Sequence, residues 1–162
     1  LHHKADLHPC PSIELAIKNA DMIITATAQK KQNCLFEKTD IMPGTHINAM
    51  GGDCSGKTEF SVQLLKACKI VVEYLPQSQD EGEIQNLPGT EIHAELWRLI
   101  TGEKTGRSND EEITLFDSVG FALEDFSILR LVYNLSESLN IGQQVNLIPT
   151  PANPKDLYGV LL

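Results

Sequence analysis

The sequence predicts an α/β fold built on a parallel sheet. Three short segments rich in Ile, Val and Thr, residues 21–28, 45–50 and 69–74, have the length and composition of buried strands. Segments with apolar residues at helical spacing alternate with them, which is typical of parallel strands joined by right-handed crossovers. The chain has 162 residues, 41% of them hydrophobic, and can bury one substantial core. We therefore expect one principal sheet flanked by helices.

The first half of the chain alternates helix and strand. A helix is expected over residues 13–19, with Ser12 as its N-cap, and the strand over residues 21–28 follows it. The strand over residues 45–50 leads into a glycine-rich segment. Apolar side chains at helical spacing then predict a helix over residues 58–67. The glycine-rich segment therefore joins a strand to a helix.

The second half continues this alternation. After the third strand, a helix is expected over residues 91–100 and should end at Gly102. Residues 113–116 supply another strand, and residues 119–139 a long helix whose apolar side chains cover several faces. The composition changes beyond residue 143, where a short strand is expected over residues 145–148.

This change predicts the domain boundary. We expect residues 1–143 to form one domain and residues 144–162 to be a segment that returns to a second domain. An irregular tail packed on its own domain explains the same proline-rich residues equally well.

The charge and the cysteines restrict the class of protein. With 22 acidic and 13 basic residues the net charge is −9, which disfavours nucleic acid and anionic membranes as partners. The four cysteines lack the short paired spacing of zinc or redox sites, so we expect free thiols in a reducing compartment and no metal site. No apolar run is long enough to cross a bilayer, and the N-terminus lacks a signal-peptide core. A cytoplasmic location and a small-molecule or protein partner are expected.

Polar or glycine-rich residues follow each predicted strand. In an open parallel sheet, ligands bind beyond the carboxyl ends of the strands, where loops and helix N-termini converge. This rule selects Thr25 and Thr27, residues 48–57, Glu73 and Tyr74, and residues 117–120.

Residues 51–58, GGDCSGKT, match the spacing of a phosphate-binding P-loop. In that interpretation backbone amides hold a phosphate, Lys57 reaches its oxygens and Thr58 reaches a magnesium ion. Two features disfavour an NTPase. Asp53 puts a carboxylate inside the anion site, and the next strand ends in Glu73 rather than in an aspartate that would hold magnesium.

The same turn also suits proton transfer. A carboxylate on a glycine-rich loop at the mouth of an α/β sheet can exchange protons with a bound amine, imine or water, and the glycines let a dinucleotide approach the backbone. Burial would raise the pKa of Asp53, whereas Lys57, four residues on, would hold it ionised; the sequence does not decide between these effects. A turn aspartate that bonds its own backbone is a third interpretation.

A resemblance decides between these interpretations. The chain contains, in order, the runs THINAMGGDCSGKTE, VVEYLPQSQDEGEIQNLP, ELWRLITGEKTGR and ITLFDSVGFALED. From about Ser12 to Tyr158 it resembles the second half of the ornithine cyclodeaminases, members of the ornithine cyclodeaminase/mu-crystallin family. Four motifs in order are more specific than one eight-residue pattern, so we interpret the P-loop match as coincidence.

The resemblance implies a Rossmann-type NAD-binding domain, present here in part, and a reaction without net redox change. L-Ornithine loses hydride from its α-carbon to give an imine, its side-chain amine closes a ring, ammonia leaves, and hydride returns to give L-proline, with NAD as the catalytic cofactor. The full-length protein is expected to be a homodimer.

The resemblance also implies roles for single residues. Asp53 matches the family's catalytic aspartate, which shuttles protons and contacts the substrate, and Val119 lies beside the substrate. Without the resemblance, Thr27 is equally well explained as a strand residue and Val119 as a core residue. The cofactor contacts that the resemblance implies are Thr27, Met50, Gly51, Gly52, Lys57 and Ser118.

The substrate prediction depends on residues 73–83. Their two Gln and four acidic residues resemble ornithine cyclodeaminases more than the alanine dehydrogenases or ketimine reductases of the family, and this favours a diamino acid. The alternative is a solvated, acidic start of a helix. A non-catalytic, mu-crystallin-like binding protein is a further alternative, which the retention of Asp53 disfavours. One departure is Ser55, which stands where the family usually has proline.

Other functional parts of the family lie upstream of Leu1 by analogy, among them its glycine-rich pyrophosphate loop. No G-x-G-x-x-G occurs in this sequence. We therefore expect the chain to be a fragment that alone neither binds NAD tightly nor turns over. His46 is interpreted as a packing residue and Trp97 as a residue of the core or of an interface. Cys54 is not expected to act as a nucleophile.

Overall fold

A computed structural model gives the fold and describes residues 6–27, 29, 31–145, 153 and 155. The chain divides into two compact units, Leu1–Phe121 and Ala122–Leu162. The boundary expected after residue 143 stays a prediction, because most of residues 144–162, including most of the expected strand over residues 145–148, lie outside the described part of the chain.

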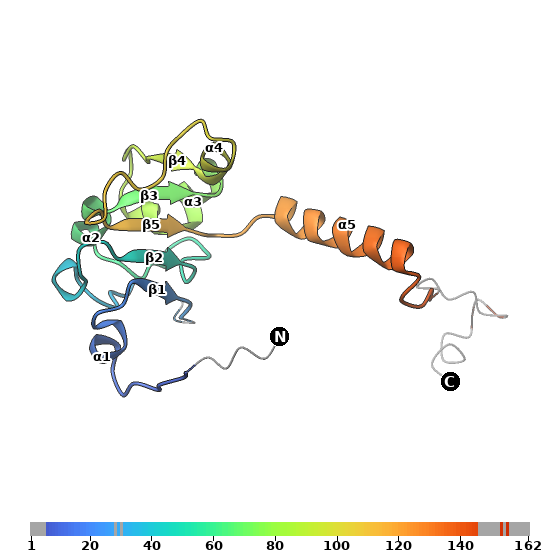
Figure 1. Ribbon diagram of the computed structural model, residues 1–162, viewed down its shortest axis with the longest axis horizontal. Helices are drawn as coiled ribbons and strands as arrows, with labels where there is room; N and C mark the ends of the chain where they lie inside the picture. The colour runs from blue at the N-terminus through green and yellow to red at the C-terminus, as the bar shows by residue number, and fades with distance from the viewer. Residues whose placement is uncertain (1–5, 28, 30, 146–152, 154, 156–162) are drawn as a thin grey trace. The chain divides into compact units, whose positions relative to one another are not determined.

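Five parallel strands form the sheet of the first unit, which confirms the predicted α/β fold (Figure 1). They are β1 (Met22–Thr25), β2 (His46–Ala49), β3 (Lys69–Val72), β4 (Ala94–Glu95) and β5 (Thr114–Asp117). In space the order is β1, β2, β5, β3, β4, so the last strand in the described part of the chain lies at the centre of the sheet.

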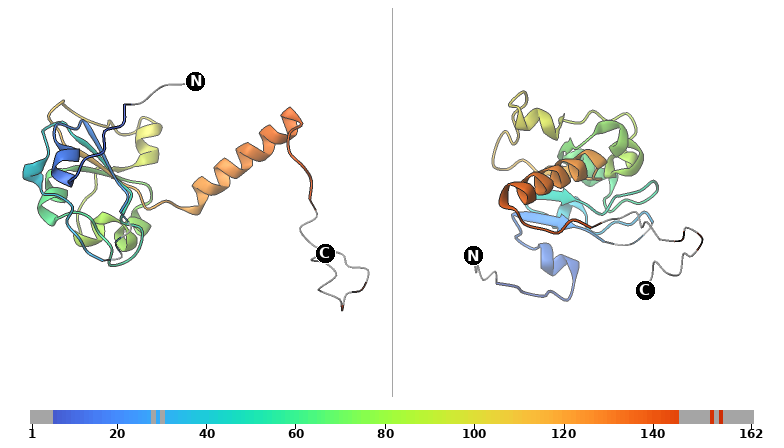
Figure 2. Two further views of the ribbon diagram at one scale, coloured as in Figure 1. Left: turned by 90° about the horizontal axis from the view of Figure 1, so that it is seen from below. Right: turned by 90° about the vertical axis from the view of Figure 1, so that its right-hand side faces the viewer.

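The hydrophobic core lies against one face of this sheet. Ile47 and Leu115 have no exposed surface, and they belong to one core with Leu64 and Leu65 of helix α2 (Val62–Ala67). Helices α2 and α3 (Leu75–Glu81) lie on this side of the sheet, and α4 (Leu96–Ile100) lies toward the other side (Figure 2). Strand residues that alternate with the core residues are half-buried or exposed, as the period of two along a strand requires.

The helix expected over residues 58–67 begins only at Val62. Ser61 caps it, because its Oγ accepts a hydrogen bond from a backbone amide of the first turn at 3.3 Å. The preceding residues are not helical, since two of their carbonyls accept hydrogen bonds from the amides of Asn33 and Leu35, at 2.8 and 2.9 Å. The prediction of the helix start was therefore wrong by four residues.

The helix expected over residues 91–100 is also shorter than predicted, because its first part is a strand. β4 pairs with β3, and the His93 amide donates to the Ile70 carbonyl at 2.8 Å. Helix α4 follows and ends before Gly102, as predicted; the φ of Gly102 is +79°, the left-handed conformation common after a helix.

Three shorter elements complete the first unit. Helix α1 (Ile13–Ile17) begins at its predicted cap, where Ser12 Oγ accepts from the Leu15 amide at 3.4 Å. The 3-10 turns η1 (Lys38–Asp40) and η2 (Glu83–Asn86) lie in segments for which the sequence predicts no regular element.

The second unit contains helix α5 (Ala122–Leu139), which begins three residues after the predicted start at Val119. Its apolar side chains are exposed, Phe126 by 58% and Leu129 by 67%. Among the described residues, no helix is both long and apolar enough to span a membrane.

Candidate functional site

The loops after β1, β2 and β5 meet at the carboxyl edge of the sheet. The Met50 amide donates to the Thr25 carbonyl at 3.0 Å, and the Ser118 amide donates to the Ala49 carbonyl at 2.9 Å. The residues expected to contact cofactor and substrate therefore gather at one edge, as the rule for open parallel sheets predicts.

Asp53 lies on the exposed turn after β2 and pairs with Lys57. Its side chain is 57% exposed, that of Lys57 only 6%, and Lys57 Nζ lies 2.9 Å from Asp53 Oδ1. The hydrogen bond from Lys57 holds the pKa of Asp53 below its ordinary value, and it outweighs desolvation because solvent still reaches the carboxylate. Of the two opposing effects on Asp53 that the sequence left open, burial and the pairing with Lys57, the pairing is the larger. Asp53 is therefore ionised at neutral pH. In this form it can accept a proton.

The turn lacks the geometry of a phosphate-binding loop. Lys57 donates to Asp53 instead of projecting freely from the turn. Helix α2 begins at Val62, so no helix N-terminus stands at the turn to bind an anion. Thr58 is 1% exposed, and its Oγ1 accepts from Asn86 Nδ2 at 2.7 Å. The P-loop interpretation is therefore wrong.

Thr27 is held by Glu59, a residue that the sequence analysis did not select. Glu59 Oε1 accepts from the Thr27 amide at 3.0 Å and from Thr27 Oγ1 at 2.5 Å. Glu59 is 1% exposed, and a Cβ placed on Gly51 would lie 2.0 Å from its carboxyl carbon. The buried Glu59 carboxyl group leaves no space for a side chain at position 51. This requirement for glycine does not depend on a ligand.

Two further carboxyl groups lie beneath the turn. Glu83 and Asp117 have no exposed surface. The oxygens Oε1 and Oε2 of Glu83 accept from the Glu59 amide at 2.9 and 3.0 Å, and Oε2 also accepts from the Phe60 amide at 3.2 Å. Asp117, at the end of β5, accepts from the amides of Glu83 and Ile84, at 2.9 and 3.2 Å. We call Glu59, Glu83 and Asp117 the buried carboxyl groups.

Burial changes the protonation of two of them. It raises the pKa of Glu83 to about 8, against the opposing effect of the backbone hydrogen bonds, and the nearby Asp117 and Glu59 carboxyl groups add to the rise. Burial also raises the pKa of Asp117 to about 6, with a contribution from Glu73. Glu83 is therefore mostly protonated at neutral pH, which avoids burying three like charges together.

Glu73 holds the turn after β5. Its Oε1 accepts from Ser118 Oγ at 2.7 Å, and its Oε2 accepts from the amides of Val119 and Gly120, at 3.1 and 2.6 Å. Gln77 Nε2 donates to the Gly120 carbonyl at 3.1 Å. These bonds explain the late start of α5. Residues 73–83 thus contact the segment expected to bind cofactor and substrate, and the Ser118 oxygen keeps its capacity to accept a hydrogen bond.

The edge places an apolar side chain on the same loop as a carboxylate. Met50 is 52% exposed and offers an apolar surface on the loop that carries Asp53. The two residues between them, Gly51 and Gly52, are buried, and a side chain on either would meet a carboxyl group beneath the turn. An apolar surface beside one carboxylate is the combination that a hydride-transfer site with proton transfer requires.

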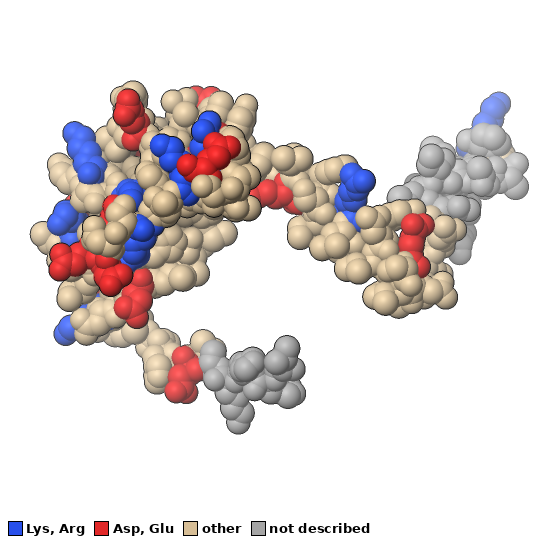
Figure 3. All heavy atoms as spheres, turned by 45° about the horizontal axis from the view of Figure 1, so that its top comes forward, with Lys and Arg blue, Asp and Glu red and all other residues tan. Residues whose placement is uncertain are grey.

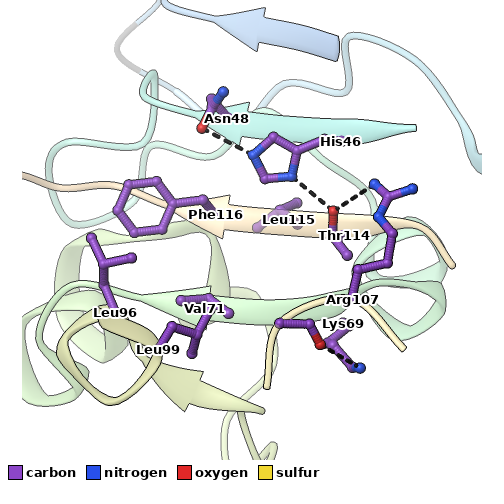
Figure 4. A pocket seen from close by; sticks show the side chains of 11 residues that line it. His46, Asn48, Lys69, Val71, Leu96, Leu99, Arg107, Thr114, Leu115 and Phe116 are labelled. Carbon is purple, nitrogen blue, oxygen red and sulfur yellow. Dashed lines mark hydrogen bonds between the residues drawn. The ribbon is translucent and has the colours of Figure 1, made fainter. Parts of the chain in front are cut away.

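A cavity of about 460 Å³ lies on the opposite, more open face of the sheet, next to α4 (Figure 4). Four of its polar side chains form one hydrogen-bonded group. His46 Nδ1 lies 2.8 Å from Thr114 Oγ1 and its Nε2 lies 3.3 Å from Asn48 Oδ1, while Arg107 donates to the same threonine at 3.2 Å. His46 is thus a satisfied packing residue, as expected. Of the residues selected beyond the strand ends only Asn48 lines this cavity, and none of the residues expected to contact cofactor or substrate does.

Trp97 is not a core residue in the described chain. It is 44% exposed, its Nε1 donates to Glu95 Oε2 at 3.0 Å, and the guanidinium of Arg98 lies 4.7 Å from its ring centroid. The prediction of core packing was wrong because α4 lies outside the core; a role in an interface stays a prediction.

Charged side chains of both signs are mixed over the face of the first unit that Figure 3 shows. Ion pairs join some of them, Lys69 with Glu112 at 2.9 Å and Arg98 with Glu103 at 3.1 Å. Neither sign dominates that face.

Comparison with known proteins assigns the family. Residues 2–140 match the model of the Ornithine cyclodeaminase/mu-crystallin family. The chain is 48% identical, over 157 residues, to an ornithine cyclodeaminase of Agrobacterium tumefaciens (strain Ach5); the match covers 97% of this chain and 44% of that protein. The chain thus spans a little under half the length of the curated relatives it matches.

Two solved structures support the same assignment. An archaeal alanine dehydrogenase dimer with bound NAD superposes with a TM-score of 0.74 at 37% identity, covering 84% of this chain and 43% of that one. A lysine cyclodeaminase, described as recognising L-lysine, L-ornithine and L-2,4-diaminobutyric acid, gives a TM-score of 0.73 at 29% identity and covers 93% and 43%. The Rossmann-type fold is confirmed by these likenesses, and the chain belongs to the ornithine cyclodeaminase/mu-crystallin family.

Proposed function

We propose that this chain is part of an NAD-dependent enzyme that converts L-ornithine to L-proline and ammonia, with Asp53 as the acid/base. The observation that carries the proposal is an ionised, solvent-accessible carboxylate on a glycine turn, beside the apolar Met50, at the carboxyl edge of the sheet. The 48% identity to an ornithine cyclodeaminase supports the choice of reaction within the family.

The proposal gives each predicted residue a distinct task. When bound, NAD would accept and return hydride. Asp53 takes a proton from the substrate amine and gives it to the departing ammonia. The hydrogen bond from Lys57 keeps the pKa of Asp53 low between turnovers. Met50 would contact the nicotinamide, with the backbone of Gly51 and Gly52 next to it. Ser118 and Thr27 contact the cofactor through oxygens that Glu73 and Glu59 hold in place.

In this proposal Val119 and Asp53 contact the substrate. Val119 follows the same turn as Ser118, and its amide is fixed by Glu73. The lysine cyclodeaminase structure supports a diamino acid as substrate, whereas the alanine dehydrogenase structure supports the main alternative within the family, a simple oxidative deamination.

The test uses the full-length protein from which this chain comes. It is incubated with catalytic amounts of NAD and, separately, with L-ornithine, L-lysine and L-alanine, and proline, pipecolate, ammonia and NADH are measured. We expect proline and ammonia in equal amounts from ornithine without net NADH. Net NADH from alanine would identify a dehydrogenase, and dinucleotide binding without turnover of any substrate would identify a binding protein.

Asp53→Asn is the decisive variant. Asn keeps an oxygen that can accept from Lys57 Nζ, so the turn should stay folded and NAD should bind with nearly unchanged affinity. Turnover should fall by about a thousandfold or more, since general acid/base groups contribute at least hundreds-fold. Asp80→Asn, on the exposed surface of α3, is the matched control and should leave turnover unchanged. Full activity of Asp53→Asn would contradict the role of Asp53.

The assembly is proposed to be a homodimer of the full-length protein. The dimeric alanine dehydrogenase structure supports this. Light scattering coupled to gel filtration measures the mass directly, and a monomer at micromolar concentration would contradict it.

A further inference from the structure

Glu83 occupies an unusual place in the first unit. It has no exposed surface, and its carboxyl group lies beneath the turn that carries Asp53, where a Cβ placed on Gly52 would lie 2.8 Å from Glu83 Oε1. Helix α3 and η2 carry it there, from a part of the sequence separate from the turn. Burying a carboxyl group is costly unless the group is hydrogen-bonded or neutral.

The hydrogen bonds of Glu83 run from the centre of the sheet to the turn. On one side the Glu83 amide donates to Asp117 of β5 at 2.9 Å. On the other side the Glu83 carboxyl group accepts from the amides of Glu59 and Phe60, the residues that follow the turn. Glu59 in turn accepts both hydrogen bonds of Thr27, after β1. One line of side-chain-to-backbone bonds thus joins three loops of the carboxyl edge.

We infer that Glu83 is a positioning residue, which fixes the Asp53 turn and the Thr27 loop relative to the central strand through the backbone of Glu59 and Phe60. The inference rests on the proposed function for its catalytic consequence, but the positioning itself is a property of this chain. Glu83 is too deeply buried to touch a ligand, so it acts only through the residues that it holds.

Either protonation state of Glu83 can accept hydrogen bonds from the Glu59 and Phe60 amides, and the pKa raised to about 8 shows that the folded chain favours the neutral state. The titratable groups facing Glu83 are Glu59, on the segment after the turn, and Asp117, at the end of β5. Both are acidic, so ionisation of Glu83 places like charges side by side in a buried region. This repulsion and the cost of burying the charge outweigh the stronger hydrogen bonds that a carboxylate accepts from the two amides, and they destabilise the folded arrangement. Positioning should therefore be complete at neutral pH and should loosen as the pH rises through about 8.

Glutamine and alanine separate this role from simple packing. Glu83→Gln keeps an oxygen that can accept from the Glu59 and Phe60 amides and cannot ionise. Glu83→Ala removes the acceptor and leaves the two amides buried and unpaired. Asp80→Asn removes a carboxylate from the exposed surface of the neighbouring helix and is the matched control.

The first measurement is amide hydrogen exchange on the 162-residue chain, expressed as protection factors so that the intrinsic effect of pH is removed. In Glu83→Ala, protection at Glu59, Phe60 and Thr27 should fall by about tenfold or more. Glu83→Gln and Asp80→Asn should stay within about twofold of the unsubstituted chain at neutral pH. Between about pH 6 and pH 9, protection should decline in the unsubstituted chain and not in Glu83→Gln.

The second measurement is the rate of proline formation by the full-length protein. Glu83→Ala should lower kcat more than it raises KM, since a misplaced Asp53 impairs the chemical step. The kcat of Glu83→Gln should equal that of the unsubstituted enzyme at neutral pH. At pH values above about 8 the kcat of the unsubstituted enzyme should decline and that of Glu83→Gln should not. If no variant converts ornithine, the proposed reaction fails while the exchange data still decide the positioning role.

The inference is overturned if Glu83→Gln loses protection as Glu83→Ala does, because a neutral acceptor would then be insufficient. It is also overturned if the unsubstituted chain and Glu83→Gln share the same pH dependence. The second comparison requires only variants that fold, so misfolding of Glu83→Ala does not weaken the test.

Discussion

Two carboxyl groups at the same edge of the sheet have opposite properties. Asp53 is 57% exposed, is paired with Lys57 and has a lowered pKa. Glu83 has no exposed surface, faces two other carboxyl groups and has a pKa raised to about 8. The exposed group is ionised and available to a ligand, whereas the buried group is neutral and accepts hydrogen bonds from the backbone that follows the turn. The difference shows that environment, more than residue type, separates a chemical role from a positioning role.

Gly51→Ala should break this arrangement most severely. The new methyl group would overlap the Glu59 carboxyl group. This carboxyl group is buried and accepts hydrogen bonds from Thr27, so it cannot move aside without losing them. We expect the free energy of unfolding to fall by about 3 kcal/mol, measured by urea denaturation. Gly56→Ala is the control: its φ of +80° strains alanine, but no atom lies in the way, and about 1 kcal/mol is expected. Equal losses in the two variants would contradict the account of Gly51.

Glu83→Gln should remove a pH dependence of stability. The pKa of Glu83 is higher in the folded chain, about 8, than in the unfolded chain, about 4.5, so folding favours the protonated form. The stability that Glu83 contributes by this preference is fully present below the unfolded pKa. It is lost as the pH rises from the unfolded to the folded pKa, by at most about 1.4 kcal/mol per pH unit. Urea denaturation from pH 5 to pH 9 measures the loss. Parallel curves for the variant and the unsubstituted chain would contradict a raised pKa.

Glu73→Gln should have a moderate effect. Gln keeps one acceptor for the amides of Val119 and Gly120 but weakens the charge-assisted bonds that Glu73 makes now. A loss of about 1 kcal/mol in unfolding free energy is expected, together with faster exchange of these two amides. Asp80→Asn again serves as the control. Unchanged exchange would show that the turn after β5 is held by other contacts.

Lys57→Met should have the smallest effect on stability and a clear effect on Asp53. Met fills the space of the buried lysine stem, and the exposed carboxylate regains water, so little folding free energy changes. Without the hydrogen bond from Lys57 the pKa of Asp53 should rise, and the acid limb of the pH profile for proline formation should move to higher pH. An unmoved acid limb would mean that another group controls the protonation of Asp53.

The sequence predicts the sheet and the location of the site well, because both depend on local patterns. Short runs rich in β-branched residues, such as KIVV, favour a strand, and parallel strands bring their following loops together. The start of α2 and the strand β4 were missed, since each is decided by a partner far along the chain. Strand β4 forms by pairing with β3. The residues before α2 stay non-helical because their carbonyls accept hydrogen bonds from the segment that contains Asn33 and Leu35.

The roles of Glu59 and Glu83 could not be predicted from their neighbours in sequence. Both look like ordinary surface glutamates in a polar context, and their burial results from the folding of η2 under the turn. The one available signal was the turn itself: two consecutive glycines indicate close approach of another group, although sequence reasoning assigned that group to a cofactor. The structure shows a carboxyl group beneath each glycine.

The most direct test is a titration of the side-chain carboxyl carbons of the 162-residue chain by NMR, with Asp53 and Glu83 assigned through Asp53→Asn and Glu83→Gln. The account predicts that Asp53 titrates below the ordinary value for aspartate, 3.8, and that Glu83 titrates near 8. Titration of Glu83 near the ordinary value for glutamate, 4.5, or of Asp53 above 3.8, would contradict the division between an ionised group at the surface and a neutral one beneath it.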